Sequence, residues 1–457
     1  LGVNTTASNN TAVGASALIS NTIGVSNVAV GYAALDANTT GDYNTSVGAG
    51  SLGANTTGIR NTAFGNQALL ANTTAQYNLA IGFNAMVSTT TGSSNIGIGY
   101  QVMDANTVGY NNTAVGFQAL LNNETGGNSV AIGYKTLENA TVGNNTAVGY
   151  EALKANTTAS FNTAIGRRAL IANTTGSANV AVGDRALEDN TTATNNAAFG
   201  QLALGNNTTG STNTAIGNHT LLLNTTGTEN VAVGTSALED NTSGVSNVAV
   251  GRSALGNNTK ASNNVAEGKT ALLGNTTGAQ NVAVGTNAMY QVTTGPNNTT
   301  VGQDTLYSAT TAEGNAALGY RAGYDVTTGE NNVLLGINAG RSTSPSGSIT
   351  TGDHNICLGD NRITNAYIKV AFTVTSDKRD KIEDGVVSHG LDFVNKLKPK
   401  SFWFRKNRES DEKHGQQRYG FIAQDILALE GSNAVVIDNK DPENLKYKGD
   451  QLIPILV

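Results

Sequence analysis

A five-residue stretch recurs along most of the chain at one fixed interval. Its clearest copy is residues 27–31 (NVAVG), and the next copy begins 17 residues later. The closing glycines keep this interval from Gly14 to Gly133, slip by one residue to Gly149, and keep it again to Gly336. Such a period indicates a solenoid, in which no repeat buries a core alone and stacking of many repeats builds one.

Each repeat is expected to form one coil made of two short strands and two turns. Residues 28–30 alternate as Val-Ala-Val, which is typical of the two faces of a strand. Gly31 allows a tight turn, residues 34–35 (Ala-Leu) supply a second inward pair, and residues 38–41 (NTTG) turn again. Coils stacked about 4.8 Å apart give a rod on the order of 100 Å long.

A coil this small has room inside for small aliphatic side chains only. We therefore expect the alanine face of the strand to need cover from outside the coil. Several parallel chains packed side by side provide that cover, and three-fold symmetry is the usual closed solution. The sequence thus predicts a mainly β, homotrimeric parallel β-solenoid or β-roll of 17-residue coils.

Composition limits the partners of such a rod. The net charge is only −6 and is spread out, which gives no basic footprint for nucleic acid. We expect no membrane insertion, since no apolar run of about 20 residues is present. Cys357 is the single cysteine, so no disulfide within the chain is predicted. No cofactor and no metal site are predicted either.

The recurring asparagines have three interpretations. The first is structural: stacked Asn side chains hydrogen-bond along the rod and tolerate the left-handed conformations of turns. The second takes Asn38-Thr39-Thr40 and its copies as glycosylation acceptors, because Asn-x-Thr is the acceptor pattern. The third takes the threonine array as a flat ice-binding face, although copies such as Asn241-Thr242-Ser243 lack the second threonine.

One repeat is a residue short, between Gly133 and Gly149. We predict that the turn at residues 138–143 absorbs the deletion, because a deletion within a strand would turn every following side chain to the opposite face.

The repeat core (NxAVG) resembles the head repeats of trimeric autotransporter adhesins, and more closely the repeats of phage tail fibres. The resemblance spans residues 10–340 and implies a parallel β-roll. The period of 17 and the extra Ala-Leu pair differ from the shorter adhesin repeat.

Beyond Gly359 the chain changes character, because charged and aromatic residues become frequent. The pattern predicts a strand over 367–374, a helix over 391–397, a strand over 401–405, a helix over 423–429 and a strand over 434–437. We therefore expect a shaft over residues 1–340, a degenerate last repeat with a connecting strand over 341–375, and a small α+β domain over 376–457.

This C-terminal segment resembles the intramolecular chaperone domains of the peptidase S74 family, which end phage tail spikes and fibres. The motifs that carry the resemblance occur in the family's order: Ser376–Lys381 (SDKRDK), Leu397-Lys398-Pro399 leading to Phe402-Trp403, Gly420–Asp425 (GFIAQD), and Tyr447 with Leu452-Ile453-Pro454. The resemblance implies a domain that drives trimerisation and then cuts itself off. Family members usually continue into a helix beyond the point that corresponds to Val457.

The resemblance assigns Ser376 as the nucleophile and Lys381 as the general base, with cleavage between Thr375 and Ser376. The spacing of Ser376 and Lys381 alone indicates only a solvated, charge-rich turn. His389 and His414 are the other candidates for proton transfer, but their spacing selects neither, and we expect both on the surface. At most the chain is a single-turnover autoprotease acting in cis.

The leading interpretation is a virion fibre, a phage tail fibre or spike, with a host-surface receptor or glycan and other tail proteins as partners. A bacterial trimeric surface adhesin or another extracellular fibre is the alternative. A glycan hydrolase would need paired carboxylates in a cleft, whereas Glu188-Asp189 and Glu239-Asp240 occupy a variable loop position and read as a solvated edge.

Overall fold

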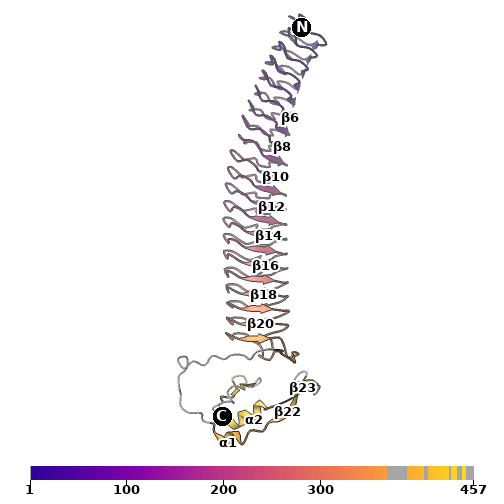
Figure 1. The fold of residues 1–457 in the computed structure, drawn as a ribbon. Helices are drawn as coiled ribbons and strands as arrows, with labels where there is room; N and C mark the ends of the chain where they lie inside the picture. Colours follow the sequence, from indigo (N-terminus) through magenta and orange to yellow (C-terminus); the bar gives the residue numbers. More distant parts are fainter. Residues whose placement is uncertain (1, 368–388, 406–409, 432–433, 440–444, 449–457) are drawn as a thin grey trace.

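The computed structural model describes residues 2–367, 389–405, 410–431, 434–439 and 445–448. Its main body is a rod of stacked coils that forms one 21-stranded parallel sheet along its length (Figure 1). The N-terminus lies at the far end of the rod, and the C-terminal segment follows the last coil. The predicted parallel β-solenoid is confirmed. The part of the chain that the structure describes holds no helix that could span a membrane.

Each coil contributes one three-residue strand to the sheet. The strands are β1 (Thr11–Val13), β2 (Val28–Val30), β3 (Thr45–Val47), β4 (Thr62–Phe64), β5 (Leu79–Ile81), β6 (Ile96–Ile98), β7 (Thr113–Val115), β8 (Val130–Ile132), β9 (Thr146–Val148), β10 (Thr163–Ile165), β11 (Val180–Val182), β12 (Ala197–Phe199), β13 (Thr214–Ile216), β14 (Val231–Val233), β15 (Val248–Val250), β16 (Val265–Glu267), β17 (Val282–Val284), β18 (Thr299–Val301), β19 (Ala316–Leu318), β20 (Val333–Leu335) and β21 (Ile356–Leu358).

The expected second strand of each coil is absent from the described coils. Around Leu35 the backbone still bonds to both neighbouring coils, since Ala33 N–H donates to Ala15 O at 2.9 Å and Leu35 N–H to Ser51 O at 3.0 Å. However, Ala33 and Leu35 have φ angles of 50° and 54°. Every second residue here is in the left-handed region, and a segment with this backbone conformation cannot form a pleated strand.

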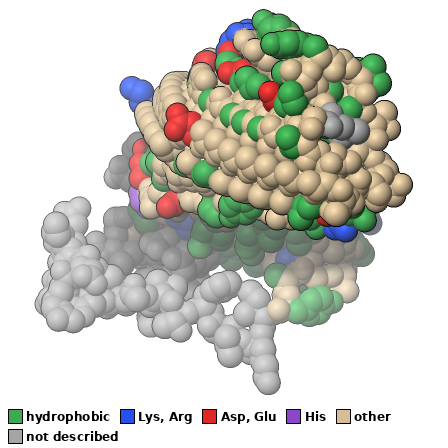
Figure 2. Space-filling view, turned by 90° about the horizontal axis from the view of Figure 1, so that it is seen from above, with side chains coloured by type: hydrophobic (Ala, Val, Ile, Leu, Met, Phe, Trp, Pro, Cys, Tyr) green, Lys and Arg blue, Asp and Glu red, His purple; other side chains and the backbone are tan. Residues whose placement is uncertain are grey.

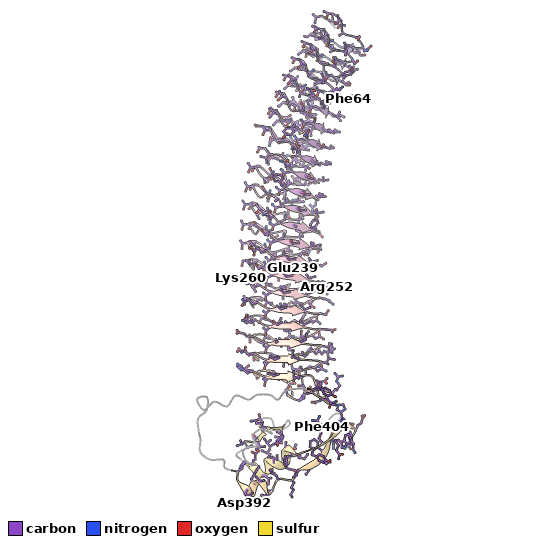
Figure 3. The ribbon with its side chains drawn as sticks, in the orientation of Figure 1. Phe64, Glu239, Arg252, Lys260, Asp392 and Phe404 are labelled. Atoms are coloured by element: carbon purple, nitrogen blue, oxygen red, sulfur yellow. The ribbon has the colours of Figure 1, made fainter. Side chains whose placement is uncertain are left out.

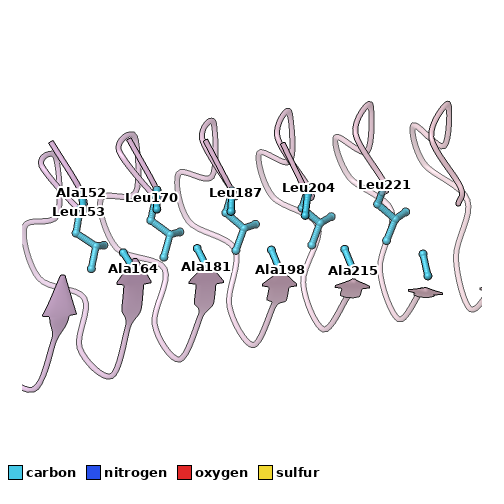
Figure 4. Close-up of a cluster of buried hydrophobic side chains, with 14 of the residues drawn as sticks. Ala152, Leu153, Ala164, Leu170, Ala181, Leu187, Ala198, Leu204, Ala215 and Leu221 are labelled. Carbon is cyan, nitrogen blue, oxygen red and sulfur yellow. The ribbon is translucent and has the colours of Figure 1, made fainter. Parts of the chain in front are cut away.

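The interior of the rod consists of two facing rows of side chains. The central residue of most strands is an alanine, such as Ala181, which points inward and meets a leucine from the opposite turn, such as Leu187 (Figure 4). Beyond the first coil, both rows are buried along the rod. The expectation that the alanine face needs outside cover is therefore wrong. The alanine side chains are small enough to leave room inside each coil, and the leucine side chains fill that room. The first and third residues of each strand point outward.

The buried leucines hold an unusual backbone conformation. Leu35 and its equivalents in most coils have φ near +50°, a conformation that costs a non-glycine residue on the order of 1–2 kcal/mol. Burying a leucine side chain contributes roughly 1.5–3 kcal/mol. Burial thus offsets the backbone cost in each coil.

The glycine after each strand is required by close approach between coils. Gly183 has φ of 141°, and a Cβ there would lie 2.4 Å from Gly200 O in the next coil. Only glycine fits this position.

One row of buried asparagines precedes the strands. Asn27 Oδ1 accepts from the backbone N–H of Asn44 at 2.9 Å, and Asn27 Nδ2 donates to Gly41 O at 2.8 Å. The same bonds recur between later coils, for example Asn230 and Asn247. This confirms the structural interpretation of the recurring asparagines.

A second buried asparagine row runs through the NTTG turn. Asn38 Nδ2 donates to Asn21 Oδ1 at 2.8 Å and to Gly41 O at 3.0 Å, and Thr39 Oγ1 donates to Thr56 O at 3.1 Å. The Asn38 amide is fully buried, so in the folded rod it is closed to glycosylation. The Thr39 hydroxyl is likewise engaged along the rod, which weakens the ice-binding interpretation.

The short repeat leaves the sheet intact. Val130, Ala131 and Ile132 pair with Thr146, Ala147 and Val148 in continuous register. The missing residue falls between Ala140 and Asn145, where the bond from Asn144 N–H to Gly127 O keeps the turn closed. The prediction that a turn absorbs the deletion is confirmed.

In its described residues, the C-terminal segment has two helices and two small antiparallel strand pairs. They are α1 (Leu391–Val394), β22 (Lys400–Arg405), β23 (Lys413–Gly420), α2 (Ala423–Glu430), β24 (Ile437–Asp438) and β25 (Lys446–Tyr447), with β22 paired to β23 and β24 to β25. The predicted strand over 401–405 and helix over 423–429 are confirmed within one residue. The helix at 391 ends at Val394, short of the predicted 397, and the strand predicted over 434–437 begins only at Ile437. The strand predicted over 367–374 lies almost entirely outside the described residues.

Candidate functional site

The two predicted catalytic residues, Ser376 and Lys381, and the bond after Thr375 lie outside the described residues. The structure describes two other candidate regions: the C-terminal segment that follows these residues in the chain, and the outer face of the rod.

A small apolar core holds the C-terminal segment together. Phe393 from α1, Ile426 from α2 and Val436 and Ile437 around β24 are buried together, with Leu397, Phe421, Ala423, Leu427 and Leu445 packed against them. Two of the sequence motifs, Leu397-Lys398-Pro399 and Gly420–Asp425, thus supply residues to one core.

Polar contacts join the same motifs. Asp425, in the first turn of α2, lies with Oδ2 2.6 Å from Nζ of Lys400 at the start of β22. A carboxylate at this place also suits the positive end of the helix dipole. The Phe421 ring lies 6.4 Å from the ring of Tyr447. The motifs that lie within the described residues therefore converge in the fold.

Glu430 is a buried acid that sequence reasoning missed. Its Oε1 accepts from the N–H groups of Val435 at 2.8 Å and Val436 at 2.6 Å, and its Oε2 accepts from Ile437 N–H at 3.0 Å. Three amide donors satisfy a buried carboxylate well. The last residue of α2 thereby fixes the start of β24.

The two histidines are less exposed than expected. His389 has a side chain only 14% exposed, with Nε2 3.7 Å from Glu430 Oε1, and its ring stacks on Phe393 at 4.4 Å. His414 is half-buried, with Nε2 3.4 Å from Arg362 O. The expectation of a surface residue is wrong for His389, because α1 and Glu430 cover it. His414 stays partly exposed beside the end of the rod.

β23 also contacts the segment that leaves the rod. Arg418 donates from its guanidinium to Thr364 O at 2.9 Å. A pocket at this junction is lined by Pro345, Ile363, Thr364, Phe404, His414 and Arg418 among others. On the rod side, Arg362 binds the Asp360 carboxylate at 2.6 Å, and this hydrogen bond lowers the pKa of Asp360.

The outer side of the sheet is a long surface that is mostly apolar, with threonine as the first residue of eight strands. We call the first and third residues of β1–β21 the strand face. The third residue is Val, Ile, Leu or Phe in every strand except β16, where it is Glu267. Many of these side chains are over a third exposed, as with Phe64 at 57% and Ile165 at 40%. Seen from the N-terminal end, charged side chains are few on the coils (Figure 2).

Aromatic side chains stack in a row beside part of the strand face. Phe83, Tyr100, Phe117, Tyr134 and Tyr150 follow the strand-ending glycines of five successive coils, with ring centroids 5.2–5.5 Å apart and nearly parallel planes. Because each inner ring is covered on both faces by its neighbours, only ring edges face solvent. The row therefore ties coils together and offers no open ring face for stacking a sugar, except at its two ends.

The two glutamates of the acidic loops contact side chains of the preceding coils. Glu188 Oε1 lies 3.0 Å from Arg168 in an ion pair, and Glu239 Oε1 lies 3.8 Å from His219 Nδ1. No cluster of three potential metal ligands occurs in the described part of the chain. These acids fit a solvated edge and do not form the paired carboxylates of a hydrolase cleft.

Comparison with known proteins places a family match at the C-terminus. Residues 376–436 match the peptidase S74 family model, the chaperone of endosialidase. The matched segment begins at Ser376 and includes Lys381, α1, the β22–β23 pair and α2. Searches of curated proteins and of solved structures found no match.

Proposed function

We propose that this chain is the shaft of a homotrimeric virion fibre, a phage tail fibre or tail spike that attaches to a host surface. The observation that carries the proposal is the sequence order: a 21-stranded solenoid is followed directly by a segment similar to the chaperone of endosialidase. That family implies trimer assembly and suggests a tail protein. A host receptor or glycan and other tail proteins are the proposed partners, and the tail is the proposed location.

The rod's uniformity explains why it would need such a chaperone. Three chains of near-identical coils lose little when they pair one coil out of step, since each coil then meets almost the same neighbours. A domain at one end that trimerises first aligns the chains before the coils wind. In this proposal residues 376–457 are that domain, and residues 1–340 are the shaft.

Cleavage would then separate the folded shaft from its template. Ser376 Oγ attacks the carbonyl carbon of Thr375 while Lys381, neutral at that moment, takes the hydroxyl proton. Lys381 passes this proton to the Ser376 nitrogen, the peptide C–N bond breaks as an ester forms, and the nitrogen leaves as the free amine. Water hydrolyses the ester, which releases the Thr375 carboxylate and restores the Ser376 hydroxyl. The shaft then persists behind an unfolding barrier.

The test is the mass of the chain in denaturant, measured on protein expressed with its complete C-terminus. Wild type is expected to give a product ending at Thr375 and a fragment beginning at Ser376. Ser376→Ala and Lys381→Ala should each remain full length and still form trimers. Cleavage of the Ser376→Ala chain at the same bond would refute the mechanism, and an unchanged folding yield after deletion of residues 376–457 would refute the chaperone role.

A further inference from the structure

The strand face is too large and too apolar to be the free surface of a single rod. Twenty-one strands about 4.8 Å apart and about 10 Å wide give on the order of 1,000 Å² of surface per chain. Exposed apolar patches on monomeric proteins rarely exceed a few hundred Å², and a specific interface needs roughly 800 Å² per partner. This face is therefore large enough to be a stable interface.

The repeat spacing of the rod indicates which partner packs against the strand face. A partner that stays in contact along the whole face must repeat at the same rise per coil, with an apolar strand at each step. Another copy of this chain meets both requirements. The inference rests on the proposed fibre, and it adds which surface joins the copies.

Glu267 is the one charged residue in the strand face. It stands in β16 between Val250 of β15 and Val284 of β17. A carboxylate pressed against apolar side chains loses its hydration, which is costly unless a cation takes its place. If copies meet at this face, Glu267 needs a partner.

Two cations at the rim of the strand face are suited to this role. Arg252 and Lys269 each follow the glycine that ends β15 or β16, and both side chains are exposed. Among the described ion pairs, neither residue contacts Glu267 or any other acid, whereas Arg167 at the same place in its coil binds Asp184 at 2.8 Å. Arg252 lies toward the same side of the rod as Phe64 of the strand face, and Lys260 lies toward the other side (Figure 3).

We propose that the strand faces of the copies pack against one another, and that Glu267 of each copy pairs with Arg252 and Lys269 of a neighbouring copy. The rim positions of the flanking coils are Thr235 and Thr286. A shift of one coil therefore loses one of the two cations, and a shift of two coils loses both. The charged site thus distinguishes one register from the others on a face that carries no other charge.

Two differently tagged full-length chains test the pairing. One carries Glu267→Arg, and the other carries Arg252→Glu with Lys269→Glu. In a cross-chain pairing each variant repels its own kind and attracts the other. Co-expression should therefore give a several-fold excess of mixed trimers over random assortment, and each variant alone should assemble less than wild type. Random assortment would overturn the pairing, because an interaction within one chain gives no preference for mixing.

Cysteine cross-linking tests the surface itself, since Cys357 is buried. Val284→Cys in the strand face should give disulfide-linked chains on oxidation, whereas Lys260→Cys on the opposite side should not. Trimers in which Val284→Cys does not cross-link would overturn the strand-face contact and leave the proposed fibre standing. A wild-type chain that sediments as a monomer would instead refute the proposed fibre.

Discussion

Replacing one asparagine of the first buried row tests what holds the coils together. The Asn230 amide accepts from the Asn247 backbone N–H at 3.0 Å and donates to Gly244 O at 2.9 Å. Asn230→Ala removes both bonds, together with the bonds that the Asn230 amide makes to Asn213 Oδ1 and Asn247 Nδ2, each at 3.1 Å. These last two atoms keep other partners. Gly244 O keeps a donor, because Asn241 Nδ2 also binds it at 3.2 Å, but the Asn247 N–H is left buried with no acceptor.

The expected loss is about 3 kcal/mol per chain, made up of about 1–3 kcal/mol for the unsatisfied donor and about 1 kcal/mol for the lost bond to Gly244. In a solenoid the effect should be local, because each coil contacts only its neighbours. Hydrogen exchange of the Asn247 amide should therefore accelerate strongly, and the apparent melting temperature should fall. Asn257→Ala is the matched control, since that side chain is exposed. If the Asn247 amide exchanges at the wild-type rate, the asparagine row does not hold the coils together.

An unpartnered acceptor, a close approach between coils and an ion pair in the rod can each be tested by substitution. Thr89→Asn should raise the free energy of unfolding by about 1 kcal/mol, because it offers a donor to Asn72 Oδ1, which now has none. Ala309→Asn should not, because at the same place in its coil it lies between the buried side chains of Val292 and Val326, which offer no acceptor; thermal denaturation compares the two. Gly183→Ala should prevent normal stacking, since its Cβ would meet Gly200 O at 2.4 Å, whereas Gly53→Ala, whose Cβ would have no contact under 3.1 Å, should fold, as judged by circular dichroism and yield. Asp360 has a pKa lowered by its bond to Arg362, so its contribution to stability is present above the ordinary Asp value of about 3.9 and is lost as the pH falls through the lower folded value. Arg362→Gln should flatten that acid-side loss in melting temperature measured against pH, and an unchanged slope would contradict the pairing.

The periodicity predicted the solenoid, the asparagine rows and the location of the deletion, because all three depend on spacing alone. It did not predict which strand face points inward. That choice depends on leucines such as Leu35 that lie in the left-handed region, and leucine gives no sequence signal for this conformation.

In the C-terminal segment the sequence predicted the elements better than their contacts. Alternation and helical spacing located β22 and α2, since both signals are local. The burial of Glu430 and His389 depends on how α1, α2 and β24 pack, which no local pattern encodes. The roles of Ser376 and Lys381 remain a prediction carried by the family resemblance.

The most direct test of the whole account is a cryo-electron microscopy reconstruction of the purified fibre. We predict three rods with a rise of about 4.8 Å per coil around a common three-fold axis, with the strand faces turned toward that axis and Glu267 at the same height in each rod. A single rod, or three rods with their strand faces turned to solvent, would contradict it.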